Sequence, residues 1–122
     1  MSGLDFDENL KTAKPLGGGL KYDAGKAPLS LIPYSAQYQE ALVLAFGAKK
    51  YDSWNWSKGM QWSRLIDAAL RHIGAYADGQ DLDPESQLNH LAHARCCLGF
   101  LLDMVESFPE GDDRRPRLKP TA

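Results

Sequence analysis

The apolar pattern of residues 88–105 constrains the fold more than any other feature of this sequence. Apolar side chains recur there at the three- and four-residue spacing of an α-helix, and they make this segment the most apolar part of the chain: Leu88, Leu91, Ala92, Ala94, Leu98, Leu101, Leu102 and Val105. A helix that is apolar over so much of its surface packs against several other elements. We therefore expect a long helix that ends near Ser107 and lies at the centre of the fold.

Two further helices and one helix start follow from local signals. Residues 35–51 combine apolar positions with Ser35 as N-cap, and residues 61–77 carry a stripe with a 3.6-residue period. Asp83-Pro84-Glu85-Ser86 has the form of a helix N-terminus, with Asp83 as N-cap. The sequence contains no strong strand pattern. The expected fold class is therefore all-α, a small bundle of three main helices.

Length and composition favour one domain with irregular ends. The 122 residues divide into an expected flexible N-terminal arm at 1–20, a helical domain at 21–108 and a disordered tail at 109–122, which mixes charges and prolines. Three helices cannot cover the apolar central helix well in a monomer. We therefore expect a homodimer or homotetramer to complete the bundle.

Charge and hydropathy narrow the class of partner. The formal net charge of -2 provides no general field that would hold a nucleic-acid backbone, so we expect no stable nucleic-acid partner. No apolar run reaches the roughly 18 residues that span a bilayer and no apolar leader opens the sequence, so we expect a cytoplasmic protein without a membrane partner. Cys96 and Cys97 are adjacent in an apolar helical run and are expected to be reduced core thiols.

All three histidines of the chain lie between residues 71 and 93, together with several carboxylates. His90 and His93 are three residues apart, so on a helix they share a face and can approach one ion together. Imidazoles and carboxylates bind divalent metals, and the candidate ligands are His72, Asp83, Glu85, His90 and His93. Two alternatives stay open: a histidine beside leucine and alanine is often a hydrogen-bonded core residue, and Asp83 with Glu85 can act only as a helix cap.

Two other segments have the composition of a binding surface. Lys21-Tyr22-Asp23-Ala24-Gly25-Lys26 combines cations, an aromatic ring and a flexible glycine, and such a loop can close on an anion. A solvated turn is the alternative. Lys50, Tyr51, Asn55 and Trp56 place a cation, aromatic faces and an amide within a few residues, which suits a purine ring. The alternative there is a packed corner between helices.

Several segments of the chain, taken in order, resemble the phage dATP/dGTP diphosphohydrolase family. The resemblance covers roughly residues 20–105 and rests on Lys21-Tyr22-Asp23-x-Gly25-Lys26-x-Pro28-Leu29, Phe46-Gly47-Ala48-x-Lys50-Tyr51, Asn55-Trp56, Trp62-Ser63-Arg64-Leu65, Arg71-His72, Asp83-x-Glu85-Ser86 and His90-Leu91-Ala92-His93-Ala94. The family is related to the all-α, MazG-like nucleoside triphosphate pyrophosphatases. These enzymes cut a triphosphate between its α- and β-phosphates and release a monophosphate and pyrophosphate.

The resemblance implies a MazG-like fold and a metal-dependent activity on dGTP or dATP. In a phage this activity would supply dGMP for 2-aminoadenine nucleotide synthesis in the host cytoplasm. The wider superfamily ordinarily holds Mg²⁺ or Mn²⁺ with Glu-x-x-Glu on one helix and Glu-x-x-Asp on the next. Here His90 and His93 fall where one acidic pair would be, and Arg71-His72 falls near the other. We therefore expect a divalent metal cofactor, Mn²⁺, Mg²⁺ or Co²⁺. Imidazole ligands would shift the preference from Mg²⁺ toward Mn²⁺, Co²⁺ or Zn²⁺. Glu40 and Asp67 are reserve ligands.

Attack of water on a triphosphate requires neutralised phosphate oxygens and an oriented water. The expected phosphate-binding residues are Lys21, Lys26, Lys50 and Arg71, and the other expected substrate-binding residues are Tyr22, Tyr51, Asn55 and Trp56. The residues expected to orient or deprotonate the water are Asp23, Glu85, His90 and His93. Two other classes stay open: a phosphohydrolase that releases nucleoside and triphosphate, and a non-catalytic helical module with a structural metal.

Overall fold

The computed structural model describes Leu20, Tyr22 and residues 24–116, and it divides the chain into two compact units, Met1–Ile32 and Pro33–Ala122. In the first unit the described residues form a turn at Gly25, with a φ of 81°, and a 3₁₀ helix at Leu29–Leu31. The expected arm lies outside the described residues except for Leu20. The expected start of the helical domain at residue 21 stays a prediction.

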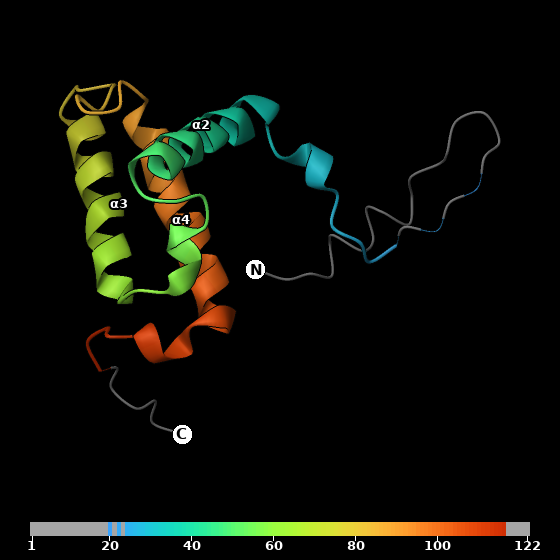
Figure 1. The fold of residues 1–122 in the computed structure, drawn as a ribbon. Helices are drawn as coiled ribbons and strands as arrows, with labels where there is room; N and C mark the ends of the chain where they lie inside the picture. The colour runs from blue at the N-terminus through green and yellow to red at the C-terminus, as the bar shows by residue number, and fades with distance from the viewer. Residues whose placement is uncertain (1–19, 21, 23, 117–122) are drawn as a thin grey trace. The chain divides into compact units, whose positions relative to one another are not determined.

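The second unit contains three α-helices, α2 (Tyr34–Lys50), α3 (Trp62–Ala77) and α4 (His90–Ser107). Figure 1 shows α3 and α4 side by side in opposite directions, with α2 across the first part of α4. The residues that the structure describes form no strand, only one isolated bridge between Leu82 and Asn89. The all-α prediction with three main helices is therefore confirmed.

The core confirms the central place of α4, because this helix contributes to both apolar clusters. Ala92 and Cys96 pack with Val43 of α2 in the first cluster. In the second cluster Met104, which is only 1% exposed, packs with Trp62 and Leu65 of α3. Burial of such side chains contributes about 1.5–3 kcal/mol each, so α4 holds both of the other helices in place.

Two predicted helix starts are wrong. α2 begins at Tyr34, and Ser35 lies inside its first turn, while the carbonyl of Pro33 accepts the first hydrogen bonds. α4 begins at His90, after the predicted N-cap Asp83, and the side chain of Asn89 caps it by accepting from the Leu91 N–H at 2.7 Å.

The segment after Asp83 forms a turn because its carboxylate caps the local backbone. Oδ2 of Asp83 accepts from the N–H groups of Glu85 and Ser86, and Gln87 then adopts a φ of 61°, which reverses the chain. Two backbone hydrogen bonds close the loop, from Asp83 N–H to the Leu88 carbonyl and from His90 N–H to the Asp81 carbonyl. The loop between α3 and α4 is therefore held along its length by hydrogen bonds.

The residues that follow α4 return to the start of α3. Pro109–Gly111 form a 3₁₀ turn, and the Trp62 indole N–H donates to the Phe108 carbonyl at 3.1 Å. The Asp113 carboxylate accepts from the N–H of Ser63 at 2.9 Å, so it caps α3, whose own N-cap Gln61 makes no side-chain bond. Within the expected disordered tail, residues 109–113 are thus anchored by hydrogen bonds, and residues 117–122 lie outside the described part.

The outer face of α3 and α4 remains apolar. We name as the apolar strip six exposed side chains from these two helices: Leu70, Ile73, Leu91, Leu98, Leu102 and Val105. Cys96 and Cys97, by contrast, lie inside with free thiols, and burial raises the pKa of Cys96 to about 12. None of the described helices has both the length and the apolar character needed to cross a bilayer.

Two glycines near the end of α3 provide a matched test of backbone conformation. Gly79 has a φ of 100°, which an L-residue rarely adopts, whereas Gly74 lies in the helix, and both have open space where a Cβ would stand. We expect Gly79→Ala to lower the free energy of unfolding by about 1–2 kcal/mol and Gly74→Ala to raise it by about 0.5–1 kcal/mol. Urea denaturation measures both, and equal effects of the two variants would contradict the turn geometry.

Candidate metal site

The site is built around a contact between two histidines on neighbouring helices. His72 lies near the end of α3, and His90 is the first residue of α4, so the antiparallel packing brings them together. Their Nδ1 atoms are 2.8 Å apart. His90 is 4% exposed, and its Nε2 lies within hydrogen-bond distance of the Oε1 of Gln80, at 2.7 Å. Both ring nitrogens of this buried histidine therefore have partners.

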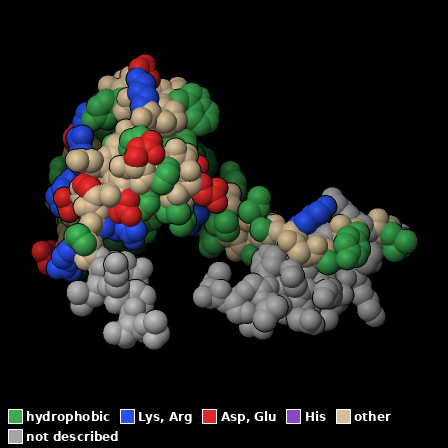
Figure 2. Space-filling view, turned by 90° about the horizontal axis from the view of Figure 1, so that it is seen from below, with side chains coloured by type: hydrophobic (Ala, Val, Ile, Leu, Met, Phe, Trp, Pro, Cys, Tyr) green, Lys and Arg blue, Asp and Glu red, His purple; other side chains and the backbone are tan. Residues whose placement is uncertain are grey.

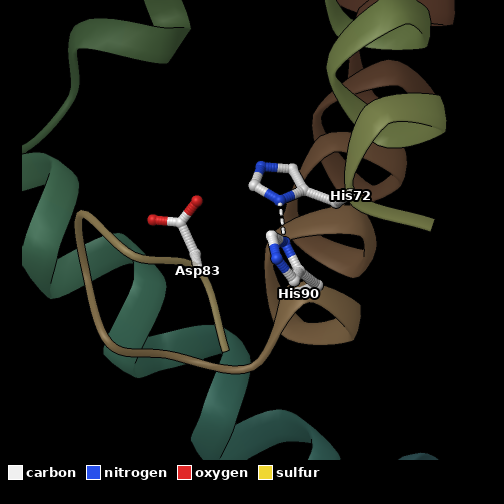
Figure 3. Close-up of side chains that lie close together, drawn as sticks. All are labelled: His72, Asp83 and His90. Carbon is white, nitrogen blue, oxygen red and sulfur yellow. Dashed lines mark hydrogen bonds between the residues drawn. The ribbon is translucent and has the colours of Figure 1, made fainter. Parts of the chain in front are cut away.

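Asp83 completes a group of three potential metal ligands. One ligand atom each of His72, Asp83 and His90 lies within 4.8 Å of the other two. Figure 3 shows that the histidines come from α3 and α4, and that Asp83 stands on the loop between these helices. Three separate parts of the chain thus supply two imidazoles and one carboxylate.

The third histidine lies beside this group with different partners. The His93 ring stacks on His72, with ring centroids 4.5 Å apart and an angle of 9° between the planes. Its Nε2 is 2.6 Å from the hydroxyl oxygen of Ser86, and its ring makes a T-shaped contact with the ring of Phe46. His90 and His93 therefore do not converge on one point as ligands here, although both contact His72.

Burial and the neighbouring histidines favour the neutral form of His72 and His93. Partial burial, followed by the charges of His93 and His90, lowers the pKa of His72. Burial also lowers the pKa of His93, although Asp83 opposes that shift. Burial by itself would raise the pKa of Asp83, but hydrogen bonds from Ser86 and the nearby histidines outweigh it and lower the pKa. Neutral imidazoles of His72 and His93 beside an ionised Asp83 offer lone pairs to a metal ion at neutral pH.

This donor set fits a divalent transition metal. Ligand atoms bound to one such ion at about 2.0–2.2 Å lie at most about 4.4 Å from each other. The three atoms here all lie within 4.8 Å of one another without an ion. Two imidazole nitrogens and one carboxylate oxygen suit Mn²⁺, Co²⁺ or Zn²⁺ better than Mg²⁺.

Glu85, expected as a metal ligand, pairs instead with Lys50 at the end of α2. Their Oε1 and Nζ atoms are 2.6 Å apart at the surface, and this hydrogen bond and charge raise the pKa of Lys50. The pair joins two residues that we assigned to the site from the sequence. Arg71, expected at the phosphates, is exposed on α3 immediately before His72.

The aromatic corner after α2 is at least partly a packing feature. Trp56 stacks on Phe100 of α4 with ring centroids 5.0 Å apart, which matches the alternative of a packed corner. Asn55 and Trp56 belong to a 3₁₀ helix, Asn55–Lys58. Tyr51 is exposed at the C-terminus of α2, where the ammonium of Lys50 lies over its ring.

The remaining expected residues lie elsewhere or are not described. Glu40, a reserve ligand, accepts a hydrogen bond from Arg95 Nε at 2.7 Å, and Asp67 is an exposed residue of α3. Tyr22 and Lys26 belong to the first unit, so their roles stay predictions. Lys21 and Asp23 lie outside the described residues.

Two polar partners of the histidines were not given a role from the sequence. Gln80 follows the glycine that ends α3, and Ser86 lies in the acidic loop. Their side chains contact His90 and His93 respectively. Only their position in the sequence could have indicated this role. Each is a hydrogen-bonding residue in the loop that connects the two helices that carry histidines.

The charge distribution agrees with the small net charge of the chain. On the face shown in Figure 2, Lys and Arg side chains are separated by acidic and apolar ones. That face therefore has no continuous basic patch for a nucleic-acid backbone.

Comparison with known proteins shows that the chain is similar to dATP/dGTP diphosphohydrolases. A family model described as dATP/dGTP diphosphohydrolase, N-terminal, matches residues 17–114. A dATP/dGTP diphosphohydrolase of Salmonella phage PMBT28 is 43% identical over 97 residues. The match covers 80% of this chain and 33% of the phage protein, so the chain spans about a third of that relative. No solved structure matches the chain.

The lowered pKa values of His72 and His93 predict how stability depends on pH without metal. Between these lowered values and about 6.5, the unfolded chain binds more protons than the folded one, so the free energy of unfolding falls as the pH falls below about 6.5. Urea denaturation with a chelator at several pH values measures this slope. His72→Asn should reduce it, and stability that is constant or rises on acidification through this window would contradict the assignment.

Proposed function

Because the chain belongs to the dATP/dGTP diphosphohydrolase family, we propose that it takes part in metal-dependent hydrolysis of dGTP or dATP to the monophosphate and pyrophosphate. The observation that carries this proposal is the His72, Asp83 and His90 group, which places two imidazoles and a carboxylate within reach of one ion. The chain corresponds to the N-terminal third of the phage relative, so the whole activity is part of the proposal.

The chemistry needs charge neutralisation more than covalent help. A divalent ion, when bound, would neutralise phosphate oxygens. Lys50 and Arg71, which belong to the same unit as the histidines, would add positive charge beside it. An incoming phosphate would compete with Glu85 for Lys50, since the two are paired only at the surface.

Water activation requires a group that can accept a proton. His93 is a candidate because its lowered pKa keeps it neutral, and Glu85 and Asp23 are the others. The base or sugar would meet Tyr51, Asn55 and one face of Trp56, whose other face is stacked on Phe100. The biological role that we propose is supply of dGMP for 2-aminoadenine nucleotides in the cytoplasm of a phage-infected cell.

The imidazole-rich donor set also favours a second candidate. A metal-histidine phosphohydrolase would cut the same substrate to nucleoside and triphosphate, and a site with two histidines and one aspartate has the ligand types of that chemistry. The two reactions differ in their products, so product analysis separates them.

Incubation of the purified chain with each of the four dNTPs in Mg²⁺, Mn²⁺ and Co²⁺ tests the function. We expect the products to be dGMP or dAMP with pyrophosphate. We expect His90→Ala and Asp83→Asn each to lose about 100-fold or more of the turnover, because each removes a group that supports transition-state charge. Asp78→Asn, an exposed substitution at the end of α3, is the matched control and should keep full turnover. Triphosphate as product would establish the second candidate, and equal turnover of all variants would exclude this site.

We also propose that the apolar strip of α3 and α4 pairs with the same strip of a second copy. It borders an open groove of about 510 Å³ lined by Ile73, Leu91, Leu98 and Leu102. A stable interface buries about 800 Å² on each partner and has an apolar centre, which this row of exposed leucines can supply. A twofold axis would let one patch serve both copies.

Sedimentation velocity of charge variants tests the pairing. Leu102 is 76% exposed in the strip, and Leu31 is 79% exposed in the first unit, so the two leucines form a matched pair. We expect Leu102→Glu to shift the protein to monomer, because pairing would bury its carboxylate, and Leu31→Glu to leave the oligomer intact. A wild-type protein that sediments as a monomer at all concentrations would refute the interface.

A further inference from the structure

Gln80 is held in place by the turn that ends α3. Its N–H donates to the Ala75 carbonyl, and the N–H of Gly79 donates to the Tyr76 carbonyl, both at 3.0 Å. These two bonds form a Schellman motif, with Gly79 in the positive-φ position. The backbone of Gln80 is therefore fixed on the helix that carries His72, and its side chain reaches across to α4.

The contact of Gln80 with His90 couples the orientation of the amide to the position of the imidazole proton. An amide oxygen can only accept, so the 2.7 Å contact of Oε1 with Nε2 requires a proton on Nε2 of His90. In the neutral ring Nδ1 then carries a lone pair. That lone pair faces Nδ1 of His72 at 2.8 Å, which completes the hydrogen bonding of a ring that is 4% exposed.

We propose that Gln80 is a positioning residue that fixes the Nε2–H tautomer and the ring orientation of His90, so that Nδ1 is offered to a metal ion. This inference rests on the metal site of the proposed function. Metal-bound histidines commonly donate their second ring N–H to an acceptor that fixes the tautomer, and loss of such an acceptor weakens metal binding. Gln80 does not itself contact the candidate ion.

The amide could also act in the opposite sense if its oxygen and nitrogen were exchanged. The amide nitrogen would then donate to Nε2 of His90, the ring proton would move to Nδ1, and no lone pair would face His72 and Asp83. The two arrangements make opposite predictions for a carboxylate at position 80, because a carboxylate can only accept.

Three variants of the full chain separate these arrangements. Gln80→Met keeps a side chain of similar length without a strong acceptor, and Gln80→Glu keeps the acceptor. Gln87→Met is the matched control, because Gln87 lies in the same loop but donates to the Pro84 carbonyl and contacts no histidine. Melting curves of the metal-free proteins verify that all three fold.

The first readout is Co²⁺ affinity, followed by visible absorption or calorimetry. We expect Gln80→Met to bind Co²⁺ about 10- to 100-fold more weakly than wild type, Gln80→Glu to bind at least as tightly, and Gln87→Met to be unchanged. Equal affinity of wild type and Gln80→Met would overturn the proposal, as would a folded Gln80→Glu variant that binds more weakly than Gln80→Met.

The second readout is the imidazole ¹⁵N–¹H correlation spectrum of the metal-free protein, which reports the His90 tautomer without any ion. We expect the Nε2–H form in wild type and a redistributed tautomer in Gln80→Met. A proton on Nδ1 of His90 in wild type would overturn the proposal. Absence of Co²⁺ binding by wild type would refute the metal site of the proposed function, and the tautomer spectra would still test the role of Gln80.

Discussion

The packing of α4 against both other helices is the interaction on which the rest of the structure depends. Met104 and Cys96 lie inside apolar clusters shared with α3 and α2, respectively. Because α3 and α4 run in opposite directions, the end of one lies beside the beginning of the other (Figure 1). His72 and His90 are 18 positions apart in sequence, yet this packing brings their rings into hydrogen-bond contact. The site is thus a consequence of helix direction and burial.

The short loop between α3 and α4 then adds the polar partners that a histidine pair needs. Gly79 ends α3, Gln80 reaches His90, Asp83 caps its own turn and joins the histidines, and Ser86 contacts His93. No buried side-chain nitrogen or oxygen in the described part of the chain lacks a partner. Such a network has few alternative arrangements, since each lost partner would leave a buried polar group unsatisfied. It therefore holds the histidines of the two helices and the carboxylate of the connecting loop in one arrangement.

The ligand types set the chemistry that this site can support. Two imidazoles and one carboxylate favour borderline metals such as Mn²⁺, Co²⁺ or Zn²⁺, whereas a cage of carboxylates would favour Mg²⁺. The family to which the chain belongs is named for dATP and dGTP. The phosphates of either nucleotide would require positive charge beside the ion. Lys50 and Arg71 belong to the same unit as the histidines, while Tyr22 and Lys26 belong to the N-terminal unit. The apolar strip of α3 and α4 is the surface at which we propose that a second copy pairs.

By itself the sequence determined the three helices and the clustering of histidines. Apolar periodicity is a local property, so it predicted α3 almost to the residue and identified α4 as the central helix. Local signals failed at Asp83, because the Asp-Pro-Glu-Ser pattern suits a helix start and a turn equally. In the structure the Asp83 carboxylate caps a turn, and the positive φ of Gln87 prevents a helix from continuing there. Spacing along one helix also suggested that His90 and His93 share an ion. The sequence named five candidate ligands. Only the tertiary structure decided that His72, Asp83 and His90 are the three that come within reach of one ion, because the neighbour of an imidazole depends on which helix packs beside it and on where the connecting loop turns.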